Sequence, residues 1–233
     1  MPEGPEIRQS RDALAKVLKG KKLSKIIIGL ESLKASQPMI AGQTVLDVDC
    51  KGKAMLIHLG NGKTIYSHNQ LYGKWVIIDG EELPESNRSL RLGLFTDKQS
   101  ALLYSASDIE LWDSVSLSEH PFLSKIGPDI LAADTTATLI LQRLQSKKFN
   151  RKSLAALYLD QHFIAGLGNY LRSEILFYAS CDATARPMDY DDSRLKKLAE
   201  QTVDVAVRSY KTFGYTVPEM SACSGIITQA DSL

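Results

Sequence analysis

The stretch KAMLIHLGNGKTIYSHN at residues 53–69 holds two short β-prone runs on either side of Asn61-Gly62. An Asn-Gly pair favours the two-residue turn that joins antiparallel strands, because both central positions of that turn need a positive backbone φ. The stretch therefore predicts a β-hairpin, and the sequence on both sides of it extends the pattern.

Six more runs of the same kind surround this hairpin and are separated by turn signals such as Asp79-Gly80. Eight short strands at this spacing predict an antiparallel sandwich or barrel. An amphipathic helix is predicted before them at residues 5–19, with Pro5 in its first turn and Gly20 at its end. The predicted strands lie at residues 23–30, 44–50, 53–60, 63–69, 74–79, 90–96, 101–107 and 109–114.

The strand signals stop after His120-Pro121, and helical periodicity replaces them. Four segments carry it, at residues 135–146, 153–163, 169–179 and 191–213. The fold class expected is α+β, with an N-terminal helix, an eight-stranded antiparallel β-sandwich and then an all-α part. We expect a β-rich domain at residues 1–125, an all-α domain at 126–215 and an irregular tail at 216–233.

The composition is that of a globular protein, since 44% of the 233 residues are hydrophobic and 24% are charged. No apolar run approaches the length of a membrane span, and the N-terminus lacks the apolar core of a secretory signal. Cys50, Cys181 and Cys223 are far apart and form no C-x-x-C pair. We therefore expect no disulfide framework, no cysteine-rich zinc module and a cytoplasmic location.

The N-terminal sequence MPEGPE brings together groups suited to amine catalysis. Removal of Met1 would leave Pro2 with a free secondary amine, and α-amino groups have a pKa of about 7.7–8.0. A neutral amine attacks carbonyl carbon to form an iminium, and Glu3 or Glu6 would shuttle protons beside it. The alternative is a plain helix start, in which both acids lie near the positive end of the helix dipole.

Two further stretches have both a functional and a structural interpretation. Lys51-Gly52-Lys53 would approach a phosphate closely, or would be an ordinary solvated strand end. Gln70, Leu71 and Tyr72 would form an exposed loop tip that wedges into a base stack. Alternatively, Leu71 and Tyr72 would be core residues of a continuing strand.

The stretch FIAGLGNYLRSEIL at residues 163–176 predicts a glycine turn followed by a helix. Gly166 and Gly168 would form the turn, and Asn169 would cap a helix beginning near Tyr170. Free N–H groups at such a helix start suit a phosphate. Just upstream, RLQSKKFNRK at residues 143–152 contains five basic residues and no acid, which is either a footprint for a phosphate backbone or a solvated basic loop.

Taken together, these motifs resemble endonuclease VIII, a family of bacterial DNA glycosylases and abasic-site lyases related to formamidopyrimidine-DNA glycosylase. The resemblance runs in order from residue 1 to about residue 213, and QLY at residues 70–72 points to the endonuclease VIII branch. The motifs that carry it are MPEGPEIR (1–8), KGKAML (51–56), SHNQLYG (67–73), LLYSASDIE (102–110), HPFLSKIGPD (120–129) and LDQHFIAGLGNYLRSEIL (159–176).

The resemblance implies a role for each candidate residue. Pro2 would be the nucleophile at C1′ of the damaged nucleotide, Glu3 the proton donor and Glu6 a support. Lys53 would bind phosphate and assist elimination. The DNA-binding residues implied are Gln70, Leu71 and Tyr72, which fill the gap left by the everted nucleotide, together with Lys125, Gly168, Asn169 and Arg172. The family has an arginine at the position of Lys125, and lysine keeps the charge without the forked geometry.

The implied function is removal of oxidised pyrimidines from double-stranded DNA, followed by β,δ-elimination through a proline Schiff base. The expected protein is a monomer that uses no nucleotide cofactor and no membrane. The family normally continues into a zinc finger with four cysteines, whereas only Cys223 lies in the last region here, so no metal or other cofactor is expected. That departure leaves an alternative, a weakly active or inactive relative that binds damaged or abasic DNA. A third, an enzyme acting on a small carbonyl compound through Pro2, would need no wedge loop.

Overall fold

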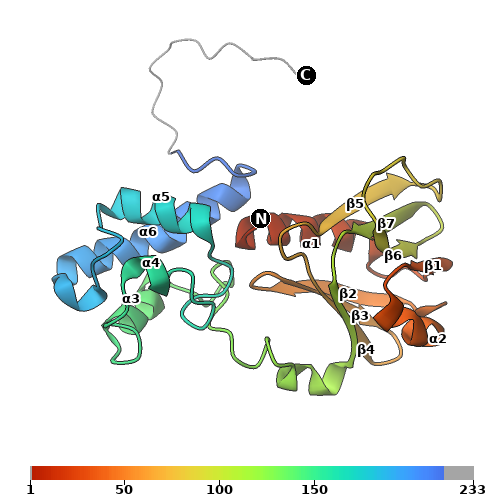
Figure 1. Cartoon of the computed structure of the whole chain (residues 1–233), viewed down its shortest axis with the longest axis horizontal. Helices are drawn as coiled ribbons and strands as arrows, with labels where there is room; N and C mark the ends of the chain where they lie inside the picture. Colours follow the sequence, from red (N-terminus) through yellow and green to blue (C-terminus); the bar gives the residue numbers. More distant parts are fainter. Residues whose placement is uncertain (1, 218–233) are drawn as a thin grey trace, which may run out of the picture.

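Two antiparallel sheets of four strands each form the N-terminal half of the computed structural model, which describes residues 2–217 (Figure 1). One sheet has the strand order β1-β6-β7-β5 and the other β2-β3-β4-β8. This confirms the predicted sandwich and all eight predicted strands. The strands are β1 (Lys25–Ile28), β2 (Val45–Lys51), β3 (Ala54–Leu59), β4 (Lys63–His68), β5 (Lys74–Asp79), β6 (Leu90–Phe95), β7 (Gln99–Tyr104) and β8 (Asp108–Asp113).

The hairpin predicted at Asn61-Gly62 joins β3 and β4. Ile57 lies opposite Ile65 in its register. The loop has three residues, 60–62, and only Gly62 has a positive φ, of +77°, so the two-residue turn with two positive φ values is not formed. Because β3 also pairs with β2, the hairpin forms the centre of its sheet.

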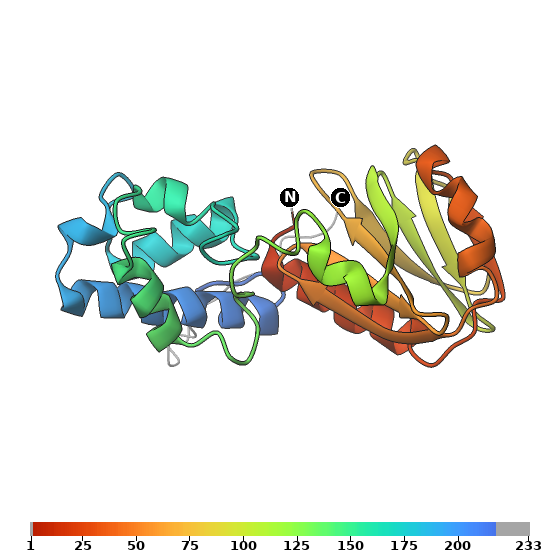
Figure 2. The same cartoon turned by 90° about the horizontal axis from the view of Figure 1, so that it is seen from below.

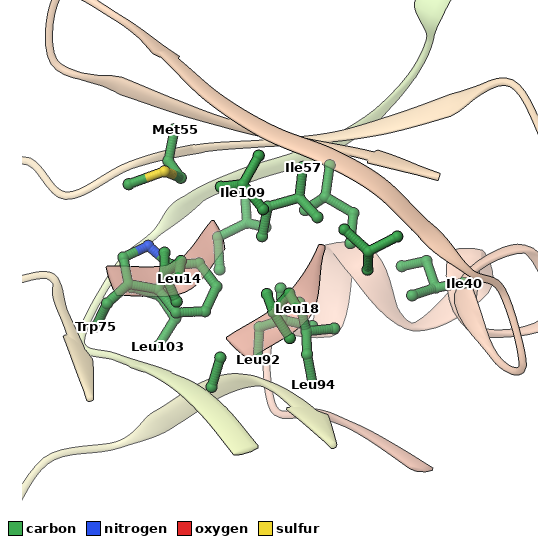
Figure 3. Packing of buried hydrophobic residues seen from close by; sticks show 14 of the residues in the cluster. Leu14, Leu18, Ile40, Met55, Ile57, Trp75, Leu92, Leu94, Leu103 and Ile109 are labelled. Carbon is green, nitrogen blue, oxygen red and sulfur yellow. The ribbon is translucent and has the colours of Figure 1, made fainter. Parts of the chain in front are cut away.

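Helix α1 (Gly4–Leu18) closes the space between the two sheets. Leu14 and Leu18 are fully buried, and Figure 3 shows them between Met55 and Ile57 of one sheet and the residues of the other. The observed helix differs from the predicted one by a single residue at each end. Its apolar face therefore belongs to the sandwich core.

The C-terminal half is helical and has its own apolar core. It contains α3 (Ala137–Gln145), α4 (Leu154–Leu157), α5 (Asn169–Ala179) and α6 (Asp192–Lys211). Figure 2 shows this half as a separate lobe, which meets the sandwich at one connecting segment and at the start of α1. The predicted α+β fold class, with a helical part after the sandwich, is confirmed.

Two local predictions differ from the structure. The helix predicted at residues 153–163 ends at Leu157, because the following chain turns and pairs with the connecting segment, where the Ala165 N–H donates to the Pro128 carbonyl at 2.8 Å. Short helices that sequence reasoning missed lie between β1 and β2, after β8, and between α5 and α6. They are the 3-10 helices η1 (Glu31–Ser36), η2 (Ser114–Glu119) and η3 (Pro187–Asp189), and the one-turn helix α2 (Gln37–Ile40).

Within the described residues, no helix combines the length and the apolar character needed to cross a membrane. The irregular tail expected at residues 216–233 falls almost entirely outside the described residues, which end at residue 217.

The sandwich core gives a direct stability test. Leu14→Ala leaves a cavity where α1 meets both sheets, so we expect the free energy of unfolding to fall by about 2–5 kcal/mol. Leu46→Ala is the matched control, because Leu46 is 56% exposed and its loss should change stability by less than about 0.5 kcal/mol. Chemical denaturation measures both, and similar losses for the two variants would contradict the assigned packing.

Candidate active site at the junction of the two lobes

The carboxylate of Glu3 joins the start of α1 to the start of α5. Glu3 is 3% exposed, and its Oε1 accepts a hydrogen bond from the Tyr170 N–H at 3.0 Å. Its Oε2 accepts from the Leu171 N–H at 3.3 Å. The first N–H groups of a helix lack partners within the helix and carry partial positive charge, so a carboxylate is stabilised there.

Gly168 makes this approach possible. A Cβ added to Gly168 would lie 2.3 Å from both Cδ and Oε1 of Glu3, a distance that real side chains do not reach. Gly168 is also the N-cap of α5, and Asn169 is the first residue of the helix. The prediction that Asn169 caps this helix is therefore wrong, because the Glu3 carboxylate takes the place of a capping side chain.

A second carboxylate holds the backbone of Glu3. Glu6 accepts a hydrogen bond from the Glu3 N–H at 2.8 Å and another from the Tyr170 hydroxyl at 2.8 Å. The Tyr170 hydroxyl also lies 3.0 Å from Oγ of Ser209 in α6. Burial and the two nearby carboxylates raise the pKa of Tyr170, which keeps its hydroxyl protonated. Sequence reasoning missed Tyr170, whose only signal was its place beside Asn169.

Lys53 approaches the same place from the turn between β2 and β3. It is 7% exposed, and burial lowers its pKa, while Glu3 and Glu6 act in the opposite direction. It is therefore not the solvated strand end that the alternative interpretation required. Asp129 fixes the turn, since its carboxylate accepts from the Gly52 N–H at 2.6 Å and from the Leu131 N–H at 2.7 Å.

Burial raises the pKa of Glu3, whereas the α5 N–H groups and Lys53 lower it and so limit the rise. Pro2 is half-buried and directly precedes Glu3. The site thus places an acid, a cation and the N-terminal proline segment at one junction.

A cavity of about 360 Å³ opens beside these groups, and both lobes line it. Gln161 shapes its wall, because its side-chain nitrogen donates to the Leu167 carbonyl at 2.9 Å and its side-chain oxygen accepts from the Gly166 N–H at 3.0 Å. Sequence reasoning did not single out Gln161 or His68. The lining residues are Lys53, His68, Leu159, Gln161, Leu167, Gly168 and Asn169.

The predicted wedge loop is exposed at its tip and anchored at its base. Leu71 is 63% and Tyr72 71% exposed, so the alternative that they are core residues is wrong. The Gln70 N–H donates to Nδ1 of His68 at 3.0 Å, and Oγ of Ser107 donates to the Gln70 side chain at 2.7 Å. Since His68 also lines the cavity, the loop and the cavity share one anchoring residue.

The remaining candidates lie around this centre. Lys125 is exposed and stands two residues before Gly127, whose N–H donates to the Gln161 carbonyl at 2.9 Å. Arg172 is half-buried, and its guanidinium lies 3.4 Å from the Ala155 carbonyl, which braces α5 against α4.

The described residues do not fit a zinc finger. Cys50 lies in the sandwich core and Cys181 follows α5, while Cys223 lies outside the described residues. Among residues 2–217, no group of three or more His, Cys, Asp or Glu side chains is arranged to hold a metal ion.

Two family models match this chain and together cover most of it. The formamidopyrimidine-DNA glycosylase N-terminal domain matches residues 1–107, and the formamidopyrimidine-DNA glycosylase H2TH domain matches residues 126–218. The chain belongs to the formamidopyrimidine-DNA glycosylase and endonuclease VIII family. Endonuclease 8 of Escherichia coli O17:K52:H18 is 44% identical over 214 residues, which are 92% of this chain and 81% of that protein. Endonuclease 8 of Salmonella arizonae is 44% identical over 216 residues, covering 93% and 82%.

Solved structures of the family share the fold of this chain. The formamidopyrimidine-DNA glycosylase of Lactococcus lactis, bound non-covalently to DNA with an abasic site, superposes with a TM-score of 0.79 at 20% identity, covering 92% of this chain and 82% of that one. The same enzyme with DNA containing an oxidised pyrimidine gives 0.80 at 21% identity, with the same coverage. This chain is a homologue of endonuclease 8 with the family's two-lobed fold.

A substitution that adds one methyl group tests the contact between Gly168 and Glu3. Gly168→Ala would displace the Glu3 carboxylate and leave two N–H groups of α5 without an acceptor, so we expect the free energy of unfolding to fall by about 1–3 kcal/mol. Gly60→Ala is the control, because its Cβ would meet its nearest atom, the Thr44 carbonyl oxygen, at an ordinary 3.5 Å. Equal stability of the two variants would show that the carboxylate does not sit on α5.

Proposed function

We propose that the chain, like the relatives named endonuclease 8, is a bifunctional DNA glycosylase and abasic-site lyase of base excision repair, acting on oxidised pyrimidines in double-stranded DNA. The observation that carries this proposal is the buried Glu3 carboxylate, held on α5 beside Lys53 and directly after Pro2. An acid, a cation and an N-terminal amine in one place are the groups that imine-forming base excision requires.

The reaction begins with the Pro2 amine, once Met1 has been removed. The nitrogen lone pair forms a bond to C1′ of the damaged nucleotide as the glycosidic C1′–N bond breaks, and the leaving base takes up a proton. The resulting ammonium loses its N–H proton, the freed lone pair forms the C1′=N bond of an iminium as the C1′–O4′ bond breaks, and the ring oxygen takes up a proton. Glu3 is the proton donor during base release.

The surroundings of Glu3 suit both of its protonation states. Burial raises its pKa, so the carboxyl retains a proton closer to neutral pH than an exposed glutamate does. After the proton has left, the α5 N–H groups and Lys53 stabilise the carboxylate. Glu6 keeps Glu3 in position through its backbone N–H.

Strand cleavage follows from the iminium, which acidifies the C2′ hydrogen. Loss of that proton breaks the C3′–O bond and releases a phosphate, and a second elimination breaks the C5′–O bond. Lys53 binds phosphate and assists these steps, and Asn169 at the start of α5 holds a flanking phosphate. Gln70, Leu71 and Tyr72 fill the space left by the everted nucleotide, which offsets part of the cost of unstacking it, about a few kcal/mol.

The proposal also covers the remaining DNA contacts, the domain boundary, the oligomeric state and the location of the protein. Lys125, Gly168 and Arg172 complete the DNA-binding surface around the cavity. The domain division at residues 125 and 126, a monomeric state and a cytoplasmic location are proposed with it. The exposed Leu71 and Tyr72 disfavour a small carbonyl substrate, because such a substrate needs no wedge.

A second candidate function is that of a weakly active or inactive relative, which would bind damaged or abasic DNA without efficient turnover. Single-turnover kinetics on an abasic-site duplex separates the two candidates.

The decisive experiment traps the iminium. With Met1 removed, borohydride should link the protein covalently to abasic-site DNA at low salt and with enzyme in excess. Retaining Met1 should abolish the link, because an acylated nitrogen has no lone pair for attack, and Pro2→Gly should reduce it. Mass spectrometry verifies the N-terminus. No cross-link with the mature N-terminus would exclude the lyase activity, and an equal cross-link with Met1 retained would assign the nucleophile to a lysine, of which Lys53 is the first to test.

Glu3 should impose a pH dependence on base excision. Because its pKa is raised above the ordinary 4.5, its protonated fraction falls as the pH rises through the raised value, and excision should fall with it. Glu3→Gln should lower excision by about 10²-fold or more and remove this limb of the profile, while borohydride trapping on a preformed abasic site persists. Loss of trapping together with excision would instead make Glu3 necessary for imine formation.

A further inference from the structure

A hydrogen bond from a distant segment reaches the wedge loop, by which we mean residues 69–73, with Leu71 and Tyr72 exposed at its tip. Arg88 belongs to the exposed segment at residues 80–89, which connects β5 to β6. Its Nη1 donates to the Tyr72 carbonyl at 2.6 Å. None of the sequence motifs that carry the family resemblance contains Arg88, so this contact gives the segment a link to the site that its sequence does not reveal.

The sheet places Arg88 beside the wedge loop. Lys74 at the start of β5 and Leu90 at the start of β6 both lie opposite Tyr104 of β7, one on each side of it. The wedge loop ends directly before Lys74, and Arg88 stands two residues before Leu90. Both segments therefore enter the sheet at the same end, and strand pairing brings the guanidinium within reach of the loop.

The first half of the wedge loop is held in a conformation that it would not keep by itself. Gln70 has a φ of +50°, in the left-handed region that side chains other than glycine rarely adopt. His68 and Ser107 bind its backbone and its side chain. The Gly73 N–H closes the loop by donating to the Asn69 carbonyl at 2.7 Å, and a Cβ at Gly73 would lie only 2.5 Å from that oxygen. Such a conformation persists where its surroundings hold it.

The second half of the loop depends on Arg88. Within residues 2–217, the bond from Arg88 is the one side-chain hydrogen bond made to the backbone of Leu71 or Tyr72. Leu71 therefore stands between Gln70, which is fixed from one side, and Tyr72, which Arg88 fixes from the other. The apolar side chain that would enter a base stack is thus carried on a frame anchored at both ends.

We propose that Arg88 is a positioning residue for the wedge, which holds the Tyr72 carbonyl so that the loop has its inserting shape before DNA binds. This rests on the proposed function for the role of the loop. A loop that is already ordered loses less conformational entropy when it enters the duplex, so more of its binding offsets the unstacking of the base. An abasic site has no base to unstack, and Arg88 therefore matters for paired lesions and little for abasic sites.

The first test uses the protein without DNA. Amide hydrogen exchange in the peptide at residues 66–76 reports on the Gln70 and Gly73 N–H groups, which are both bonded within the loop region. Arg88→Ala should speed this exchange by about fivefold, because the loop opens more often without its second anchor. Asn87→Ala is the matched control, an equally exposed neighbour in the same segment, and it should leave the exchange unchanged.

The second test compares two substrates in single turnover with enzyme in excess. Arg88→Ala should slow excision from a duplex with one thymine glycol paired to adenine by about tenfold, and should change borohydride trapping on a preformed abasic site by less than about twofold. In a Leu71→Ala background, Arg88→Ala should slow excision by less than about twofold more, because the placement of the loop matters little once its wedge side chain is gone. The Asn87→Ala control should match the unsubstituted chain on both substrates.

Unchanged hydrogen exchange in Arg88→Ala would overturn the proposal, and so would full additivity with Leu71→Ala. Equal losses on both substrates, with a shallower dependence of binding on salt, would assign Arg88 to a direct phosphate contact instead. A lower midpoint of chemical denaturation would make its role one of general stability. The exchange test needs neither DNA nor turnover, so failure of the positioning role is distinguishable from failure of the proposed chemistry, which trapping by the unsubstituted chain reports.

Discussion

The hydrogen bonds from the start of α5 to the Glu3 carboxylate are the constraint on which the rest of the site depends. A buried carboxylate is costly unless its oxygens are satisfied, and the first N–H groups of a helix are costly unless they find acceptors. Here the N–H groups of Tyr170 and Leu171 donate to the Glu3 carboxylate, so the helix start and the buried carboxylate satisfy each other's hydrogen-bonding groups. The arrangement requires glycine at position 168, where any side chain would occupy the space of the carboxylate.

Further hydrogen bonds near Glu3 hold the two lobes together and shape the site. The Gly4 N–H donates to the Gly166 carbonyl at 2.7 Å, and Gly52 on the turn that bears Lys53 donates to Asp129. Every one of these bonds joins the sandwich lobe to the connecting segment or the helical lobe within a few residues of the cavity. The contacts that dock the lobes are thus also contacts of the site, so a change that loosens the docking should disturb the site as well.

The sequence predicts the elements that local patterns determine, and it does not predict the site contacts between residues that are distant along the chain. The strands were predictable because turn residues such as Asn61-Gly62 and the apolar runs are local signals. Asn169 was misassigned as a helix cap because its competitor, Glu3, comes from 166 residues earlier in the chain. Asp129 had no local signal, because its carboxylate binds the N–H of Gly52, which lies far away in the sequence. Gln161 had none either, because its side chain binds a backbone N–H of the glycine turn, and that contact exists only in the folded chain.

Opposing effects act on the pKa values of Glu3 and Lys53, and they bear on the roles proposed for these two residues. Burial disfavours the charged form of both groups, while each one's charge favours the charged form of the other. Placed alone in this position, Glu3 would hold its proton too firmly and Lys53 would lose its charge more readily. Together, and with the α5 N–H groups, they keep an acid able to release its proton beside a cation able to meet a phosphate. The proposed chemistry therefore depends on the geometry of the junction as well as on the residues themselves, and the start of α5 fixes the position of the Glu3 carboxylate in it.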